Sequence, residues 1–294
     1  MSGKKPETPI QRPMTDDTPR VEITRRHAVN GIVTIGALGT VAGVGAATSG
    51  NGKDPTQFTV RVENVASLDE YPSAPDPPLS TGGAVWITPG AYGIYKGSNP
   101  ILNRNKAASS GLEAIAEAGR PSGTPENDSL VAELRDDSKV AEAGAWTPAD
   151  TVADPNDPLG SVPGAPPIAS GGAFEFDIEA APGQKLAFAT MFVPSNDVFF
   201  APGPGGINLF EDDAPVEGAV TDDVRLWDAG TEPNEDPSSD SPNQAPRQGL
   251  EFGNPDKGPD EDGVVRELRP TDKVDDGYSY PDPSEAIDVT ITPQ

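Results

Sequence analysis

Short segments in which apolar and polar residues alternate recur along the chain after residue 57. Residues 58–63 follow this pattern, and so do residues 174–179. A period of two is typical of a strand with one face in the core and one in water. Pro182-Gly183 separates the second segment from residues 185–193, which are apolar at nearly every position. We expect the two to form a hairpin whose second strand is central and buried on both faces.

Several weaker segments also predict strands. Residues 84–88 and 91–95 are expected to be two short strands with a bend between them at Pro89-Gly90, which is a turn pair. Further candidates are residues 207–210, 224–227, 249–252, 264–268 and 287–291. Many short strands separated by turns predict an all-β, antiparallel sandwich.

Two short helices and two long loops complete the expected domain. Ser109 and Ser110 offer an N-cap for a helix that ends at Gly119, and residues 129–134 predict a second helix. Residues 141–170 are rich in Pro, Asp, Gly and Ala without a periodic apolar face, so they are expected to form a long surface loop. Residues 233–247 predict a mobile loop beside a site built by the preceding strand.

The N-terminal region has a different pattern. Arg25-Arg26 precede an uncharged apolar run at residues 32–47, which is followed by small and polar residues. This order is typical of a twin-arginine signal peptide. A run of 16 residues spans about 24 Å as a helix, against about 30 Å of membrane hydrocarbon, although an uncleaved membrane tether remains the alternative. We expect residues 1–56 to be signal peptide and linker, and residues 57–294 to be one secreted or cell-surface domain.

The charge of that domain is strongly negative. The chain has 21 Lys and Arg against 47 Asp and Glu; seven of the basic and five of the acidic residues lie in residues 1–56, so 14 basic and 42 acidic residues remain, a net charge of −28. This self-repulsion is screened in concentrated salt, where the Debye length falls to about 3 Å at 1 M. The composition is therefore typical of a halophilic protein and excludes the basic face that nucleic acid requires. The 34 Pro and 32 Gly would also suit a disordered chain, but the clustered aromatic strands favour a folded one.

Few chemistries are open to these residues. The chain has no Cys, and its one His is His27 in the expected signal peptide. Disulfides, Ser-His-Asp catalysis and His-bound zinc are thereby excluded from the mature domain. A metal would have to be held by oxygen, which suits calcium or magnesium. The acidic runs at residues 211–213, 222–223 and 260–262 are expected to be solvated surface, and Trp86, Trp146 and Trp227 to be core or loop anchors rather than sugar platforms.

Three segments carry a resemblance to a known family. They are residues 87–119, residues 191–200 with the sequence MFVPSNDVFF, and residues 226–232 with the sequence LWDAGTE. In this order they resemble the spondin N-terminal domain, which would span nearly all of residues 57–294. The resemblance implies a C2-like β-sandwich with one or two short helices and long acidic Pro/Gly-rich loops, used in adhesion.

The resemblance also implies a calcium site with ligands Asp197, Asp228 and Glu232. The family has Asp where this chain has Glu232, a His where it has Tyr95, and cysteines that it lacks. Independently of the family, Asp197 and Asp228 follow apolar strand segments, and Gly230 permits a tight return that would turn Glu232 toward Asp228. Alternatively, the two aspartates are ordinary turn residues that bind nearby backbone N–H groups.

These observations predict an exported, non-catalytic, calcium-binding adhesion module. Its expected partner is a cell-surface glycoprotein or polysaccharide, with no nucleic acid, and with membrane contact only through an uncleaved N-terminal segment. One alternative is an exported carboxylate-based hydrolase, for which Glu175 or Asp177 would serve because they flank aromatic residues on one strand. The other is a structural cell-envelope protein without a discrete ligand.

Overall fold

The structure is a computed structural model that describes residues 54–70, 83–122, 129–153, 167–237, 241, 243–244, 258–268 and 280–294. The expected signal peptide lies outside the described residues, as does the expected strand at 249–252. None of the helices in the described ranges is long and apolar enough to cross a membrane.

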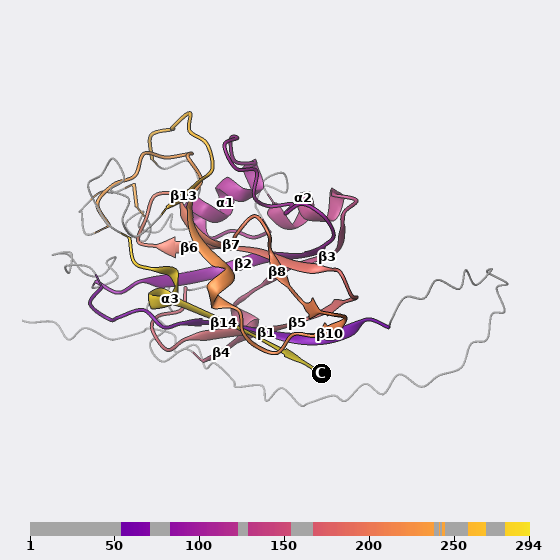
Figure 1. Ribbon diagram of the computed structural model, residues 1–294. Helices are drawn as coiled ribbons and strands as arrows, with labels where there is room; N and C mark the ends of the chain where they lie inside the picture. Colours follow the sequence, from indigo (N-terminus) through magenta and orange to yellow (C-terminus); the bar gives the residue numbers. More distant parts are fainter. Residues whose placement is uncertain are drawn as a thin grey trace, which may run out of the picture. The chain divides into compact units, whose positions relative to one another are not determined.

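Two antiparallel sheets form the domain, one above the other in Figure 1. The five-stranded sheet has the order β11 (Gly218–Ala219), β14 (Ile287–Pro293), β1 (Thr56–Asn64), β5 (Ala173–Ala180) and β4 (Thr151–Ala153). The larger sheet has the order β13 (Arg266–Leu268), β12 (Val224–Asp228), β7 (Val198–Pro202), β6 (Lys185–Val193), β2 (Trp86–Tyr95) and β3 (Val140–Trp146), with β8 (Ile207–Asn208) also paired to β6. β9 (Phe210–Glu211) and β10 (Ala214–Pro215) pair separately. The predicted all-β antiparallel sandwich is confirmed.

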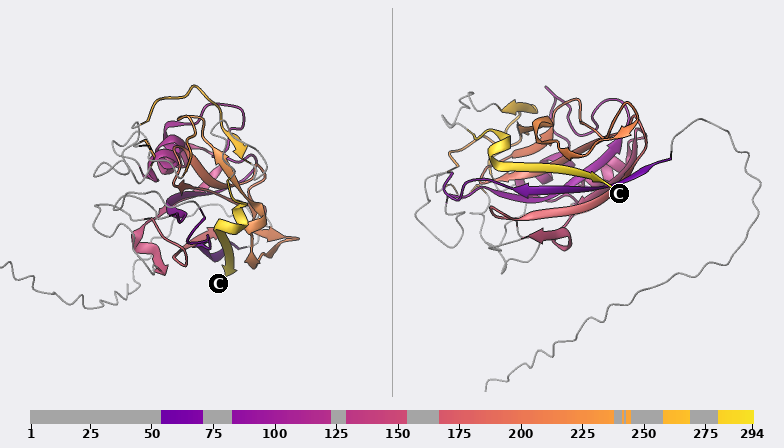
Figure 2. Two further views of the ribbon diagram at one scale, coloured as in Figure 1. Left: turned by 90° about the vertical axis from the view of Figure 1, so that its left-hand side faces the viewer. Right: turned by 60° about the horizontal axis from the view of Figure 1, so that its bottom comes forward.

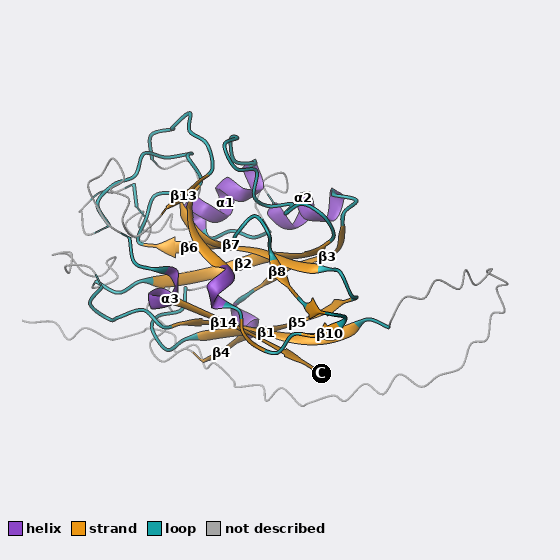
Figure 3. Cartoon of the chain, viewed as in Figure 1, coloured by secondary structure: helices purple, strands orange, loops and turns teal. Residues whose placement is uncertain are grey.

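Helices cover the outer face of the larger sheet, as Figure 3 shows. They are α1 (Ser110–Ala118) and α2 (Leu130–Asp136), and the single-turn α3 (Pro283–Ala286) precedes β14. Two 3₁₀ turns, η1 (Pro148–Asp150) and η2 (Thr221–Asp223), lead into β4 and β12. Ser109 caps α1 through the backbone N–H of Leu112, and Ser129 caps α2 through that of Ala132, as the sequence predicts.

Apolar side chains fill two layers. Between the sheets lie Phe58, Phe174, Phe188, Phe200 and Val289, all without solvent exposure. The second layer joins the helices to the larger sheet. β6 contributes to both layers and is buried from Leu186 to Val193, as expected for a central strand. β14 lies along β1, which Figure 2 shows in its right-hand view, and so completes the smaller sheet.

The predicted hairpin between β5 and β6 is wrong. Gly183 does adopt a positive φ of 82°, and the N–H of Gln184 donates to the carbonyl of Ala181 (3.0 Å), so the chain turns where expected. However, β5 pairs with β1 while β6 pairs with β2, in the other sheet. The connection therefore crosses the sandwich, because β5 has a wet face and β6 has none.

The predicted bend at Pro89-Gly90 is also wrong, since β2 continues through both residues. Pro89 has no N–H to donate to a neighbouring strand. It is accommodated because the register with β6 shifts between Ile87 and Gly90, and a bulge at this point leaves Pro89 outside the regular pairing. Gly90 is required for packing instead: a Cβ there would lie 2.3 Å from the side chain of Trp146 and 2.4 Å from the carbonyl oxygen of Ala189.

The predicted loop at residues 141–170 is wrong in its first part, because it contains β4 and most of β3. β3 is built largely from Ala and Gly, which have low strand propensity, so the sequence gives little sign of it. The strand β7 is likewise absent from the expected strands, and residues 207–211 form two short strands rather than one.

Candidate metal site

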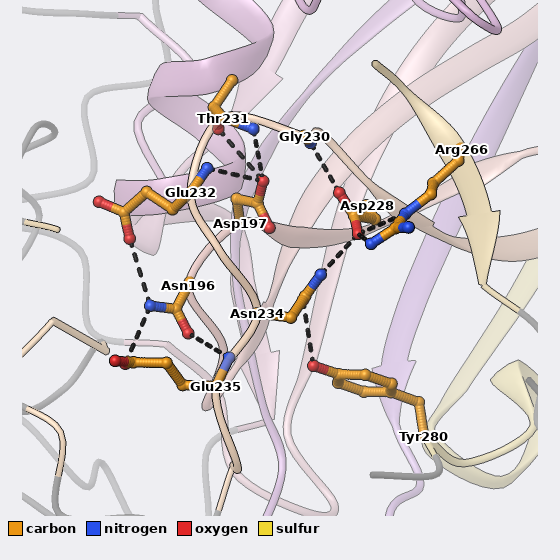
Figure 4. A network of polar contacts seen from close by, with 10 residues as sticks. All are labelled: Asn196, Asp197, Asp228, Gly230, Thr231, Glu232, Asn234, Glu235, Arg266 and Tyr280. Atoms are coloured by element: carbon orange, nitrogen blue, oxygen red, sulfur yellow. Dashed lines mark hydrogen bonds and ion pairs between the residues drawn. The ribbon is translucent and has the colours of Figure 1, made fainter. Parts of the chain in front are cut away.

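The candidate site lies where β6 leads into β7 and where β12 ends. Residues 194–197 connect β6 to β7, and Ser195 closes this turn with its hydroxyl. That hydroxyl donates to the carbonyl of Phe192 (2.6 Å) and accepts from the N–H of Val198 (3.1 Å). β7 and β12 pair so that Asp228 stands opposite Val198. Asp197 and Asp228 are therefore neighbours at adjoining strand ends, as Figure 4 shows.

Asp197 is fully buried, and only one of its two carboxylate oxygens accepts hydrogen bonds from the described residues. Its Oδ2 accepts from the backbone N–H groups of Thr231 (2.8 Å) and Glu232 (3.1 Å) and from the Thr231 hydroxyl (3.3 Å). Its Oδ1 is buried without a hydrogen-bond partner among the described residues. Burial, and secondly the nearby charge of Asp228, raise the pKa of Asp197 well above its usual range. A carboxylate in this setting favours binding a proton or a cation.

Asp228 is also fully buried, but both of its oxygens are engaged. Oδ1 accepts from the N–H of Gly230 (2.7 Å), and Oδ2 accepts from Nδ2 of Asn234 (2.6 Å). Arg266, which stands opposite Asp228 in the ladder of β12 and β13, also donates to Oδ2 through Nε (2.9 Å) and Nη2 (2.7 Å). The Arg266 side chain is 42% exposed, so a half-solvated cation neutralises a carboxylate that has no solvent contact of its own.

The turn after Asp228 depends on Gly230. This residue has a φ of 69°, and a Cβ there would lie 2.5 Å from the backbone nitrogen of Val264. Its carbonyl accepts from the N–H of Gly263 (2.9 Å), and the carbonyl of Thr231 accepts from that of Glu261 (2.7 Å). These contacts hold the chain in the tight return that the sequence predicts.

Glu232 reaches Asp197 with its backbone and not with its carboxylate. Its Oε1 accepts from the N–H of Gly258 (2.7 Å), and its Oε2 lies 3.4 Å from Nδ2 of Asn196. Asn196 also donates to Glu235 (3.1 Å). Figure 4 shows the carboxylate of Glu232 on the side away from Asp228. The structure therefore brings Asp197 and Asp228 together, and it uses the Glu232 carboxylate to hold the surrounding loop.

The fit to a metal is partial in the geometry described. Calcium takes six to eight oxygen ligands, and the unpartnered Oδ1 of Asp197 supplies one oxygen with no competing contact. Asp228 could contribute once Arg266 moves away from its Oδ2. Within the described ranges, no three acidic side chains already lie close enough to hold an ion. Asp197 and Asp228 thus fit a hard cation, whereas the carboxylate of Glu232 does not in its present position.

Other residues singled out by the sequence lie elsewhere. Asp177 is exposed on β5 and bonded to Thr59, and Glu175 pairs with Arg61 (2.8 Å), so neither is in an apolar pocket. All three tryptophans are buried, as expected for core anchors. The acidic runs are exposed at most positions, as expected for solvated surface.

Three residues at the site were not found from the sequence: Arg266, Asn234 and Glu117. The last is a buried glutamate of α1 that acts electrostatically on Asp197. No spacing rule connects these residues to the two aspartates, and charged residues are too frequent in this chain for their presence to be informative.

No protein-family model matches this chain, and no curated protein matches it either. The resemblance to the spondin N-terminal domain therefore stays a prediction, and a function has to be argued from the geometry of the site.

Proposed function

We propose that this protein is an exported, non-catalytic binding module whose loops are stiffened by one calcium ion at Asp197 and Asp228. The observation that carries the proposal is the Oδ1 atom of Asp197, a buried carboxylate oxygen without a partner, beside a second buried carboxylate. Two neighbouring buried carboxylates repel each other, and a divalent cation would remove that repulsion while supplying the missing contact.

The cation would act on the loops rather than on the sheets. Asp197 lies in the connection between β6 and β7, while Asp228 begins the turn that contains Gly230 and Thr231. These segments come from separate parts of the chain, so a shared ion ties them together. Calcium-stiffened loops at the end of a sandwich offer a fixed surface for a ligand, for which we propose a cell-surface glycoprotein or polysaccharide.

Acid–base catalysis by the same pair is the competing function, because a hydrolase also needs one carboxyl group with a raised pKa. Asp197 meets that requirement, but neither aspartate has any solvent exposure. A glycosidic substrate would have to contact both carboxyl groups, whereas a small ion needs only a cavity of its own size. The burial of the pair therefore favours the ion.

The test is calcium-dependent melting of the mature domain in molar potassium chloride, so that general charge screening is already saturated. Calcium should raise the melting temperature, with about 2.7 kcal/mol of stabilisation at a hundredfold excess over Kd. Asp197→Asn should remove most of this gain. Asp177→Asn, which removes one exposed carboxylate on the other sheet, should keep it.

Two results would reject the proposal. One is an absence of any calcium response in the wild-type domain at calcium concentrations well above about 10⁻³ M, the weak end of extracellular calcium modules. The other is an equal response in the wild type and in Asp197→Asn, which would place the ion elsewhere on the acidic surface. The binding role is tested separately, by sedimenting the domain with cell envelopes of the producing organism with calcium or with a chelator.

A further inference from the structure

Two arginines flank one glutamate on the outer face of the larger sheet. Trp227 of β12 stands opposite Glu267 of β13, and Arg225 lies two residues before Trp227, so these side chains share one face. Trp227 packs in the layer between the sheet and the helices, which identifies this face as the outer one. Arg104, from the segment between β2 and α1, lies over the Trp227 ring, with its guanidinium carbon 5.5 Å from the ring centroid.

Glu267 is the shared ion-pair partner of the two arginines, but it accepts a hydrogen bond from neither. Its Oε2 lies 3.7 Å from Nη2 of Arg104, and its Oε1 lies 3.9 Å from Nε of Arg225. Both distances exceed the length of a hydrogen bond. The Glu267 side chain is 19% exposed, whereas those of Arg104 and Arg225 are 45% and 43% exposed. Within this group of three, one positive charge is in excess, on guanidinium groups that solvent reaches.

Other contacts hold both guanidinium groups in place. Nη1 of Arg225 donates to the backbone carbonyls of Asp222 (2.5 Å) and Val224 (2.6 Å). Arg104 rests on the buried Trp227 ring, whose face attracts a cation, and it makes no hydrogen bond to the described residues. A ligand would therefore meet two arginines that are already positioned, and less conformational entropy would be lost on binding.

This arrangement fits an anionic group. A guanidinium presents its donors in a planar fork that matches a carboxylate or a tetrahedral oxyanion. Residues 57–294 contain 14 basic residues against 42 acidic ones, so two arginines at one carboxylate are a local exception to the charge of the domain. An anion is repelled by the acidic surface elsewhere and attracted here.

We propose that Arg104 and Arg225 bind the sulfate or carboxylate groups of an anionic polysaccharide, and that such a polymer is the ligand of this binding module. This inference rests on the proposed function, because it names the chemistry of the ligand. β12 carries both Arg225 and Asp228, and β13 carries Glu267 next to Arg266, so the two arginines adjoin the candidate metal site.

The shape and repetition of a polysaccharide favour it over an acidic protein. A folded acidic protein would bring its surface against the surrounding carboxylates as well, whereas a polysaccharide chain is narrow enough to contact the two arginines alone. Its repeated anionic groups also raise the effective concentration at one small contact. In molar salt the Debye length is about 3 Å, so only direct contacts with the guanidinium groups keep their strength.

The experiment measures binding of the domain to dextran sulfate, hyaluronate and unmodified dextran by calorimetric titration, in molar potassium chloride with calcium. Dextran sulfate tests for sulfate, hyaluronate tests for carboxylate, and dextran is the neutral control. At least one anionic polymer should bind, and dextran should not. Arg104→Gln combined with Arg225→Gln should weaken that binding by about tenfold or more, because hydrogen bonds to charged groups are lost at both arginines.

Arg61→Gln combined with Arg135→Gln is the matched control, because it removes the same charge elsewhere. Arg61 lies in the smaller sheet and pairs with Glu175, and Arg135 of α2 donates to Ala143 of β3, at the opposite edge of the larger sheet from β13. This variant should bind the polymer as the wild type does. Equal calcium-dependent melting in all variants shows that the fold and the candidate metal site are intact.

Arg104→Lys combined with Arg225→Lys separates a specific contact from general attraction. Lysine keeps the charge and much of the cover over Trp227 but lacks the planar fork. Binding that depends on the fork should weaken by about threefold or more, whereas attraction by charge alone leaves the affinity unchanged. This variant also carries the test should the Gln variant fold poorly.

Three results would overturn the inference: no binding of either anionic polymer to a wild-type domain that still responds to calcium, wild-type affinity in the Lys variant, or wild-type affinity in a folded Gln variant. Poly-glutamate that binds as tightly as the preferred polysaccharide would assign the two arginines to an acidic peptide instead. A wild-type domain whose melting temperature does not respond to calcium would reject the proposed function itself.

Discussion

Arg266 and Asp228 form a pair in which one charge is buried and the other is half in water. The carboxylate has no solvent exposure, and two guanidinium nitrogens lie within 2.9 Å of its Oδ2. Taking a carboxylate out of water is expensive, and removing its partner costs more than the pair itself contributes. Arg266 therefore neutralises the buried charge of Asp228 in the calcium-free site, as a metal ion would in the calcium-bound site.

The first prediction follows for Arg266→Met. The calcium-free domain should lose about 1–3 kcal/mol of stability, because Asp228 stays buried with only Gly230 and Asn234 as donors. Calcium should then stabilise the variant more than the wild type, since no guanidinium competes for Oδ2. Melting curves with and without calcium, in molar potassium chloride, measure both effects.

Arg225→Met is the matched control. Arg225 lies on β12 with a side chain 43% exposed, nearly the same as Arg266, but it contacts Glu267 at 3.9 Å and not Asp228. It should leave the calcium response unchanged. A calcium response that is equal or smaller in Arg266→Met than in the wild type would contradict competition between arginine and metal.

At the scale of single residues, the sequence predicts that Asp197 and Asp228 lie at strand ends, because each follows an apolar segment and precedes a turn. It could not predict which acidic side chains turn inward. Glu232 follows Asp228 by four residues and yet its carboxylate accepts from the N–H of Gly258, whereas Glu117 is buried although nothing in the sequence around it predicts this. These differences arise from how loops and a helix pack on the sheet, and a sequence with 42 acidic residues after residue 56 gives no local signal for them.

Among the elements, α1 packs on β6 and β7 from outside the larger sheet. Gly119 ends it with φ 61° and ψ 34°, the left-handed conformation of a helix C-cap, and its N–H donates to the carbonyl of Ile115 (2.8 Å). It also lies against Thr88 of β2, whose Oγ1 accepts from the N–H of Met191 (3.0 Å) and is therefore fixed. The cap thus sets the distance between α1 and the sheet.

The second prediction concerns Gly119→Ala. A Cβ at this position would lie 2.6 Å from Cγ2 of Thr88, so the variant combines about 1 kcal/mol of backbone strain with a steric clash. It should be destabilised by about 2 kcal/mol or more. Chemical denaturation measures the loss of stability.

Gly97→Ala provides the control, because Gly97 also has a positive φ (93°) but a Cβ added there would have no atom within 4 Å. It should show the backbone strain alone. Equal destabilisation of both variants would mean that the contact with Thr88 is relieved without cost.

The sequence predicts helices and strands correctly where a local signal determines them. It fails where the neighbouring strand or helix determines the structure. The serine caps and Gly119 mark both helices within a residue or two, and the continuous apolar run predicts the buried β6. Alternation in residues 174–179 predicts which face of β5 is wet, but it does not identify β1 as the neighbour of β5. β3 is not predicted because it consists largely of Ala and Gly, which have a low strand propensity. These small residues allow its close contact with Tyr92 and α2.

Residues 57–294 carry a net charge of −28, which their fold must tolerate. All three residues of the acidic run Glu211-Asp212-Asp213, on and beyond β9, are exposed, and so are Asp222 and Asp223 in η2. The chain has only 21 basic residues against 47 acidic ones, and among the described residues Arg61, Arg104, Arg225 and Arg266 each lie within 4 Å of a carboxylate. Screening by salt has to replace the missing positive charge.

The third prediction is that the domain loosens or unfolds when it is moved from molar potassium chloride to dilute buffer, where the Debye length exceeds about 10 Å below 0.1 M. Circular dichroism and melting temperature, both measured with a chelator present, follow the transition. A variant with Glu211→Gln, Asp212→Asn and Asp213→Asn removes three negative charges from one exposed segment. Asn also suits positions 212 and 213, which have φ values of 48° and 64°, because it adopts the left-handed conformation more readily than most residues.

If repulsion between surface carboxylates sets the salt requirement, this variant should stay folded at lower salt than the wild type and should melt at the same temperature in molar salt. Potassium sulfate gives the necessary comparison, because a strongly excluded anion also strengthens apolar burial. If repulsion sets the requirement, the salt concentration needed for folding should fall from wild type to variant by a similar ratio in both salts. If stronger apolar burial sets it, this concentration should depend on the anion and be the same for wild type and variant. A wild-type domain with the same melting temperature in dilute buffer as in molar salt would show that −28 charges are tolerated without screening, and the halophilic interpretation would have to be given up.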